Sequence, residues 1–208
     1  MNLHYEVIPD ENIAVCRDAC NELMAYQKSK AYITPERFDS MSFETRLVPS
    51  VQKALHNYTV VVKDGEQIVG YVYANISPKE TYANEFATFF DMSSVSRPNV
   101  GCLSQFYIKE GYRQYGIGSK LFRMAMDWLT QFEDVDDYFI YVSNGNDNAL
   151  EFYKRKGFAV SHDILEGFIT VLRRSRQGSC PLVYNEQEDP RASVLKPGNL
   201  ENNQNGAV

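Results

Sequence analysis

Apolar residues along the chain follow two spacings that alternate from the N-terminus onwards. Short runs rich in Val, Ile, Tyr and Phe are typical of β-strands, whereas an apolar residue at every third or fourth position is typical of an amphipathic helix. Strands are predicted at residues 3–8, 58–63, 67–76, 102–108, 137–143, 159–163 and 168–172. Helices are predicted at residues 10–27, 35–56 with a break near residue 49, 117–132 and 147–156.

Turn residues and a change in composition mark the limits of these elements. Asp64-Gly65 suits the positive φ angles of a tight hairpin turn between two of the strands. Residues 77–100 contain Pro, Ser and Asn without a clean period, which predicts a long loop. From residue 175 the chain is rich in Gly, Pro, Asn, Gln and Glu. We therefore expect a domain over residues 1–174 and a polar tail over 175–208.

Composition and charge exclude several classes of protein. Hydrophobic residues make up 44% of the chain, which is too many for a disordered protein. A net charge of −6 without a basic cluster disfavours nucleic acid as a partner. No window approaches the roughly 20 apolar residues of a membrane span, and the N-terminus lacks export features. A cytoplasmic protein without a membrane partner is expected.

The cysteines and histidines give no metal-binding pattern. Cys16, Cys20, Cys102 and Cys180 are scattered, and in a chain without export features they are expected to be free thiols. Cys16 and Cys20 lie in an apolar series with helical spacing, so they are expected to be buried packing residues rather than ligands. The three histidines are far apart in sequence. No metal is predicted.

The turn before the longest predicted helix has the features of an anion site. Between Arg113 and Ser119, Gly116 and Gly118 lie where a strand gives way to a helix. The first N–H groups of a helix lack intrahelical acceptors, and the helix dipole adds positive charge there. A phosphate or pyrophosphate would fit, although a plain turn also explains two glycines. Leu121 replaces the third glycine of a dinucleotide fingerprint, and no P-loop lysine is present.

Two motifs together resemble those of the GNAT superfamily of acetyl-CoA-dependent N-acetyltransferases. They are Arg-x-x-Gly-x-Gly at residues 113–118, and Asn-Asp-Asn-Ala-Leu-Glu-Phe-Tyr at 146–153 with Lys-Gly-Phe at 156–158. The order of strands and helices over residues 3–172 is also similar. The resemblance implies an α/β (α+β) fold with a mixed, mostly antiparallel central sheet flanked by helices. It further implies that two central strands splay apart.

The resemblance also implies a site for acetyl-CoA as cosubstrate. The pantetheine arm would enter between the strands at residues 102–108 and 137–143. The residues implied for binding are Gln114, Tyr115, Gly116, Ile117, Gly118 and Ser119 for the pyrophosphate, with Arg113 at the head of the motif, the backbone of Phe106, Tyr107 and Ile108 for the pantetheine, and Asn146 for the cofactor arm. Asn146 is also a good helix N-cap, and the two roles are compatible.

The resemblance places Tyr153 near the thioester sulfur, whereas the alternative is a packed aromatic like its neighbour. Full proton transfer from a phenol to a departing thiolate is uphill by about 1.5 pKa units, so a hydrogen bond to the sulfur is as plausible as protonation. Some family members carry a glutamate base on the fourth strand, but Cys102 occupies that position here. The base is therefore unassigned. Glu44, Glu110 and Asp91 are candidates, with solvated surface charges as the alternative.

The expected function is acetyl transfer from acetyl-CoA to a primary amine. The acceptor is not identified and could be a polyamine, an amino acid, an aminoglycoside or a protein N-terminus. The alternative is a catalytically silent acyl-CoA-binding or sensing protein. A homodimer is compatible with the sequence.

The resemblance implies that the acceptor enters near residues 32–44 and the loop 77–100. Phe86, Phe89 and Phe90 of this loop either form a cluster that pins it or line a slot for the acceptor. In the second case Glu44 or Asp91 would pair with an ammonium group.

Overall fold

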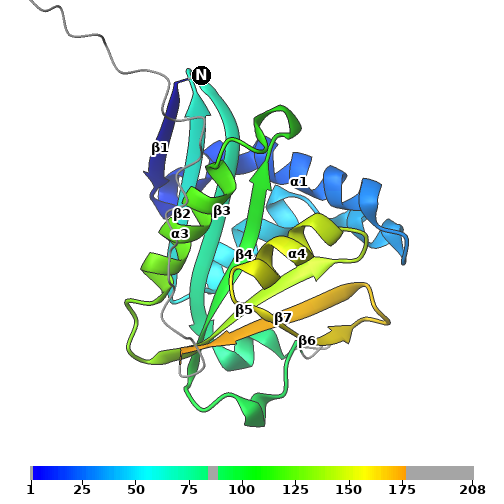
Figure 1. Cartoon of the computed structure of the whole chain (residues 1–208). Coiled ribbons are helices and arrows are strands. Elements are labelled where there is room, and N and C mark those ends of the chain that lie inside the picture. Colours follow the sequence, from blue (N-terminus) through cyan, green and yellow to red (C-terminus); the bar gives the residue numbers. More distant parts are fainter. Residues whose placement is uncertain (1, 84–88, 177–208) are drawn as a thin grey trace, which may run out of the picture.

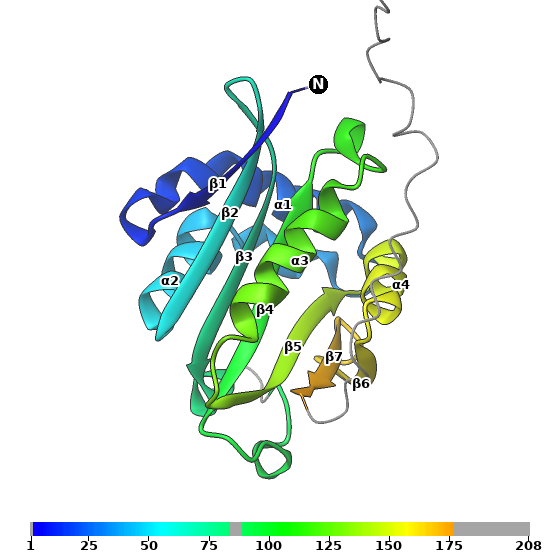
Figure 2. The same ribbon diagram turned by 60° about the vertical axis from the view of Figure 1, so that its left-hand side comes forward.

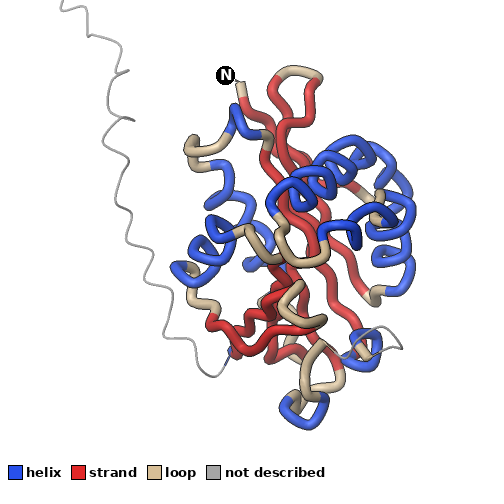
Figure 3. Tube along the Cα trace, turned by 90° about the vertical axis from the view of Figure 1, so that its right-hand side faces the viewer, coloured by secondary structure: helices blue, strands red, loops and turns tan. Residues whose placement is uncertain are grey.

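The computed structural model describes residues 2–83 and 89–176. One seven-stranded sheet, in the order β1-β2-β3-β4-β5-β7-β6, runs through the described part, with helices on both of its faces (Figures 1 and 3). The strands are β1 (Leu3–Ile8), β2 (His56–Asp64), β3 (Gln67–Pro78), β4 (Asn99–Ile108), β5 (Val135–Ser143), β6 (Ala159–Ile164) and β7 (Ile169–Ser175). The α-helices are α1 (Arg17–Lys30), α2 (Val48–Lys53), α3 (Ile117–Leu129) and α4 (Asp147–Arg155).

Only β4 and β5 pair in parallel, and every other pair of neighbouring described strands is antiparallel. The predicted α/β (α+β) fold with a mixed, mostly antiparallel sheet flanked by helices is thus confirmed. The two last strands, predicted at 159–163 and 168–172, are also present, and their ends differ from the predicted ones by at most three residues.

The two faces of the sheet carry separate hydrophobic cores. Val60 and Val62 of β2 are fully buried against Leu121 of α3. Val61 between them points the other way and is buried with Leu23 of α1. Figure 2 shows α3 in front of the strands and α1 behind them. Because both faces are covered, β2 carries consecutive buried valines rather than apolar residues at alternate positions only.

The first helical region is less regular than predicted. Residues Asp10–Cys16 form a 3₁₀ segment, and only then does α1 begin, continuing to Lys30. Cys16 and Cys20 are fully buried, free thiols in this region, as expected. Cys180 lies outside the described residues.

The helix predicted at 35–56 is three short pieces, and its break was misplaced. The pieces are Pro35–Ser40 (3₁₀), Phe43–Leu47 (a π-helical turn) and α2. The chain breaks before Ser42, whose side chain forms a capping box with Thr45. Pro49 lies in the first turn of α2, where its missing N–H costs nothing.

The parallel pairing of β4 with β5 is short. It runs from Asn99 to Leu103 on β4 and ends at Ile140 on β5, although both strands continue further. At the same point β4 contains a bulge against β3, with Ser104 as the extra residue. A bulge bends its strand, so the two strands diverge beyond it, as Figure 1 shows. The predicted splaying of the central strands is confirmed.

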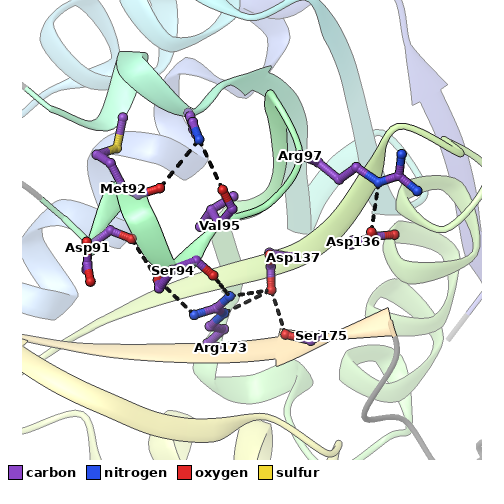
Figure 4. Close-up of polar contacts among 10 residues, drawn as sticks. Asp91, Met92, Ser94, Val95, Arg97, Asp136, Asp137, Arg173 and Ser175 are labelled. Carbon is purple, nitrogen blue, oxygen red and sulfur yellow. Dashed lines mark hydrogen bonds and ion pairs between the residues drawn. The ribbon is translucent and has the colours of Figure 1, made fainter.

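The loop after β3 is fixed to the sheet by polar contacts (Figure 4). It contains 3₁₀ turns at Lys79–Tyr82 and Met92–Ser94. Arg173 of β7 donates from Nη2 to the carbonyl oxygen of Ser94 at 2.7 Å and from Nε to Oδ1 of Asp137 on β5 at 2.9 Å. The Asp137 side chain is only 4% exposed, so its charge depends on these donors.

The last strand continues to Ser175, three residues beyond its predicted end, and residue 176 closes the described part. Most of the expected tail, residues 177–208, lies outside the described residues, as does Phe86. Within the described part, no helix is long and apolar enough to cross a membrane.

Arg173→Met should lower the free energy of unfolding by about 2–3 kcal/mol, because it leaves the buried carboxylate of Asp137 without its cation. Urea denaturation followed by circular dichroism measures the change. The control is Lys154→Met, which removes a half-exposed helix pair with Glu151 and should cost at most about 0.5 kcal/mol. Equal effects of the two substitutions would contradict the structural role of Arg173.

Candidate functional site

The space between the diverging strands is a cavity of about 310 Å³. Its walls come from β4, β5, α1, the start of α3 and α4, together with short segments on either side of the sheet. Residues from these elements that line it include Leu23, Tyr26, Arg46, Phe89, Ser104, Gln105, Phe106, Tyr107, Ile108, Arg113, Gly118, Tyr141, Ser143, Asn146, Phe152 and Tyr153.

The second half of β4 offers a free backbone edge to this cavity. Beyond Leu103 the strand pairs with β3 on one side, and β5 no longer pairs with it on the other. Phe106, Tyr107 and Ile108, the residues predicted to meet the pantetheine, lie in this half and line the cavity. An extended ligand with amide groups could hydrogen-bond to such an edge as an added strand does.

The glycine turn presents unpaired N–H groups at one end of the cavity. Gln114 and Gly116 have φ angles of 71° and 75°, and α3 begins immediately afterwards. Within the described chain, no side chain caps this helix, and the N–H groups of Ile117, Gly118 and Ser119 have no acceptor. The positive end of the α3 dipole is therefore not neutralised by a hydrogen-bond acceptor from the described residues.

Arg113 is held beside this helix start. Its Nε donates to the carbonyl oxygen of Ile108 at 3.1 Å, and its guanidinium carbon lies 4.4 Å from the centre of the Tyr26 ring. Lys156 of the Lys-Gly-Phe motif approaches the same turn, with Nζ 3.4 Å from Oγ of Ser119. The sequence motif contains Lys156, to which no role was assigned, and the structure places its charge beside the first turn of α3.

The predicted cofactor residues divide into two groups. Phe106, Tyr107, Ile108, Arg113, Gly118 and Asn146 line the cavity. Gln114, Tyr115, Gly116, Ile117 and Ser119 form the adjoining turn and do not line it. Tyr115 is 62% exposed, whereas the Ile117 side chain is buried in the core against the sheet. What this second set offers beside the cavity is the unbonded backbone N–H groups of Ile117 and Ser119.

Asn146 precedes α4 as predicted, but its side chain does not cap the helix. It occupies the N-cap position of α4, but its side chain makes no capping hydrogen bond. Its backbone carbonyl oxygen instead accepts from the N–H groups of Ala149 and Leu150, at 3.0 and 3.1 Å. The side chain is thereby left for the cavity that it lines.

Tyr153 lines the cavity with a ring that is almost fully buried. The ring lies edge-on to Phe106, with centroids 6.3 Å apart, and its hydroxyl has no hydrogen-bond partner among the described residues. Burial, and secondarily the neighbouring Cys102, raises the pKa of Tyr153 well above its usual value. The phenol is therefore a neutral donor at physiological pH. Tyr153 therefore both packs in the hydrophobic core and lines the cavity.

The segment that follows α1 is fixed to the end of β5 by Asn144. Its Oδ1 accepts from the backbone N–H groups of Tyr32 and Ile33 at 2.7 and 2.8 Å, and its Nδ2 donates to the carbonyl oxygen of Phe168 at 3.2 Å. Gly145 comes next, and a Cβ there would lie 2.0 Å from the carbonyl oxygen of Lys30. This close approach keeps the C-terminal half of α1 over the cavity.

None of the three carboxylates considered as bases lines the cavity. Glu44 pairs with Arg17, Asp91 caps the turn at Met92–Ser94, and Glu110 is exposed. Asp and Glu are in fact missing from all of the described lining residues. Cys102, at the expected position of a strand glutamate, is buried, which raises the pKa of its thiol to about 12. These candidates are surface charges outside the cavity wall, and the pairing of an ammonium group with Glu44 or Asp91 stays a prediction.

The two described phenylalanines of the loop lie in different places. Phe90 is buried and stacks on Phe139 with ring centroids 4.3 Å apart, so it pins the loop to the sheet. Phe89 lines the cavity and lies edge-on to Tyr141.

The sequence analysis missed Tyr141 and Arg46. The hydroxyl of Tyr141 is buried without a hydrogen-bond partner among the described residues, and burial raises its pKa. Its strand was predicted, but a strand buried on both faces does not reveal which side chains meet a cavity. Arg46 lies in the π-helical turn, which no sequence pattern distinguished from an ordinary helix. Among the residues described, no three His, Cys, Asp or Glu side chains gather as metal ligands do.

Two solved N-acetyltransferase structures with ligands have the same fold. The structure matches that of PaiA N-acetyltransferase from Thermoplasma acidophilum in complex with coenzyme A, with a TM-score of 0.60 and 16% identity, covering 84% of this chain and 99% of that one. It also matches Arabidopsis thaliana NAA60 in complex with a bisubstrate analogue, with a TM-score of 0.56 and 13% identity, over 86% of this chain and 100% of the other. At these identities the similarity concerns the fold alone.

Sequence comparison identifies the family. A stretch of 61 residues is 36% identical to "Probable N-acetyltransferase san" of Drosophila melanogaster, but it spans only 29% of this chain and 30% of that protein. The family model described as "Acetyltransferase (GNAT) family" matches residues 23–158, which contain the glycine turn, both splayed strands and Tyr153. The chain belongs to the GNAT family of acetyltransferases.

Proposed function

We propose that this protein transfers an acetyl group from acetyl-CoA to a primary amine. The observation that supports this proposal is the arrangement of one cavity. It has an anion site of free N–H groups and Arg113 at one end, an unpaired β4 edge along its wall, and Tyr153 within it. A pyrophosphate, an extended amide-containing arm and a thioester follow one another in acetyl-CoA in the same order.

In this reaction the neutral amine attacks the thioester carbonyl. The new C–N bond forms, the C–S bond breaks, and the electron pair of that bond leaves with the thiolate. The proton lost by the amine is taken up by solvent, because no described carboxylate lines the cavity. Tyr153, kept neutral by its raised pKa, would donate a hydrogen bond to the departing sulfur.

A second candidate is an acyl-CoA-binding protein without turnover, favoured by Cys102 where some relatives carry a glutamate. Incubation with acetyl-CoA and a panel of amines separates the two. Release of free thiol that depends on the amine would support acetyl transfer, whereas binding of coenzyme A without such release would support the second candidate.

Gly118→Val tests the cofactor site. A Cβ at Gly118 would already be in contact with Ile108 Cδ1 at 3.4 Å, so the branched methyl groups extend into the cavity at the expected pyrophosphate position. Calorimetric affinity for coenzyme A should fall by about tenfold or more.

The matched control is Gly111→Val on the exposed turn before it, where an added Cβ meets nothing within 4 Å. Its affinity should equal that of the parent protein. Unchanged affinity in the folded Gly118 variant would remove the pyrophosphate from this turn.

Tyr153→Phe tests the chemistry. The substitution keeps the buried ring and removes only the hydroxyl, so kcat should fall by about 10²-fold while KM for acetyl-CoA stays within about twofold. Tyr138→Phe is the control, because Tyr138 is a buried tyrosine of the same core that does not line the cavity. A parent-like kcat in the Tyr153 variant would leave this residue as a packing aromatic only.

A further inference from the structure

Arg46 is a cation in the cavity without a counter-ion in the described chain. Its backbone is fixed, since its N–H donates to the carbonyl oxygen of Ser42 at 2.9 Å and its own carbonyl oxygen accepts from Oγ of Ser50 at 2.7 Å. The side chain lines the cavity and forms no hydrogen bond or ion pair with any described residue. Nearby Arg17, by contrast, pairs with Glu44.

The environment of Arg46 makes an unpaired charge there costly. Burial among the cavity walls lowers its pKa, although a guanidinium stays protonated at physiological pH. A charge removed from bulk water needs a partner of opposite sign. Such a partner must come from a ligand or from outside the described residues.

Arg46 and Arg113 reach the cavity from different places along α1. The π-helical turn that carries Arg46 is held to the first half of α1, where the backbone N–H of Phe43 donates to Oδ1 of Asn21 at 2.8 Å. Arg113 instead donates from Nη1 to the hydroxyl of Tyr26 at 3.3 Å, five residues further along α1. Arg46 is therefore a second cation of the cavity, separate from the one beside the glycine turn.

The charges that line the cavity fit one kind of acceptor. Arg46 and Arg113 are the only charged residues among its described lining, and both are positive. A polyamine would bring more positive charge into this space, whereas an amine with an acidic group would neutralise Arg46. We propose that Arg46 binds a carboxylate carried by the acceptor, and thereby selects amines that bear an acidic group.

This inference rests on the proposed acetyl transfer and specifies its substrate class. The carboxylate has two possible sources, which are the α-carboxylate of a free amino acid and an acidic side chain near the N-terminus of a peptide. Arg offers either of them a bidentate fork of N–H donors.

The kinetic test compares acids with their amides. The acceptors are alanine against alaninamide, and the amidated peptide Ala-Glu-Ala against Ala-Gln-Ala. The parent protein should prefer the acid of at least one pair by about tenfold in kcat/KM, and the pair that shows the preference identifies the source. Arg46→Gln should abolish the preference by raising KM for the acid, with KM for acetyl-CoA unchanged, and Arg46→Lys should restore part of it. Arg17→Gln, which removes a cation outside the cavity, should keep the full preference.

A binding measurement makes the test independent of turnover. Calorimetry on the protein saturated with coenzyme A compares N-acetylalanine with N-acetylalaninamide, and an N-acetylated Ala-Glu-Ala amide with its Gln counterpart. Tighter binding of an acid that is lost in Arg46→Gln supports the inference, even if no amine is acetylated and the proposed function fails. Acid and amide bound equally in both pairs, or spermidine acetylated in preference to every acid, would overturn it while leaving acetyl transfer intact.

Discussion

The short parallel pairing of β4 with β5 is the constraint on which the site depends. Two neighbouring strands normally stay hydrogen-bonded along their length, because unpaired backbone groups in an interior are costly. Here they separate after Leu103 and Ile140, where Ser104 bulges from β4. The separation creates the cavity, leaves one strand edge unpaired, and positions α3 and α4 on its rim. A ligand that restores the missing backbone pairing is therefore favoured over one that only fills space.

Those elements that are determined by a local sequence pattern were predicted correctly. Runs of β-branched residues, the glycine turn and the periodic apolar face of α3 specify elements by their own spacing, and the two motifs added the topology. The short helices at 35–53 were predicted poorly, because their form depends on packing against α1 and on the capping box of Ser42 rather than on a repeat. Propensity is a weak guide where tertiary contacts decide.

The cavity itself was predictable only near the glycine turn. This turn is contiguous in sequence, so Arg113 and Gly118 could be recognised together. Arg46, Phe89 and Tyr141 also line the cavity, but they come from three separate elements, and no spacing relates them. Asn146 shows a further limit, because a sequence can place an N-cap but cannot say whether its side chain points to the helix or elsewhere.

The loop after β3 separates stability from recognition. Phe90 and Ser94 hold it to the sheet, through Phe139 of β5 and Arg173 of β7 respectively. Lys79 closes the loop on itself by donating to the carbonyl oxygens of Met92 and Val95. Phe89, between these anchors, contributes to the cavity wall instead. Mutations at Phe89 can thus reshape the cavity wall while the anchoring contacts persist. In evolutionary terms, this fold can vary the shape of its cavity through one loop without first losing its ability to fold.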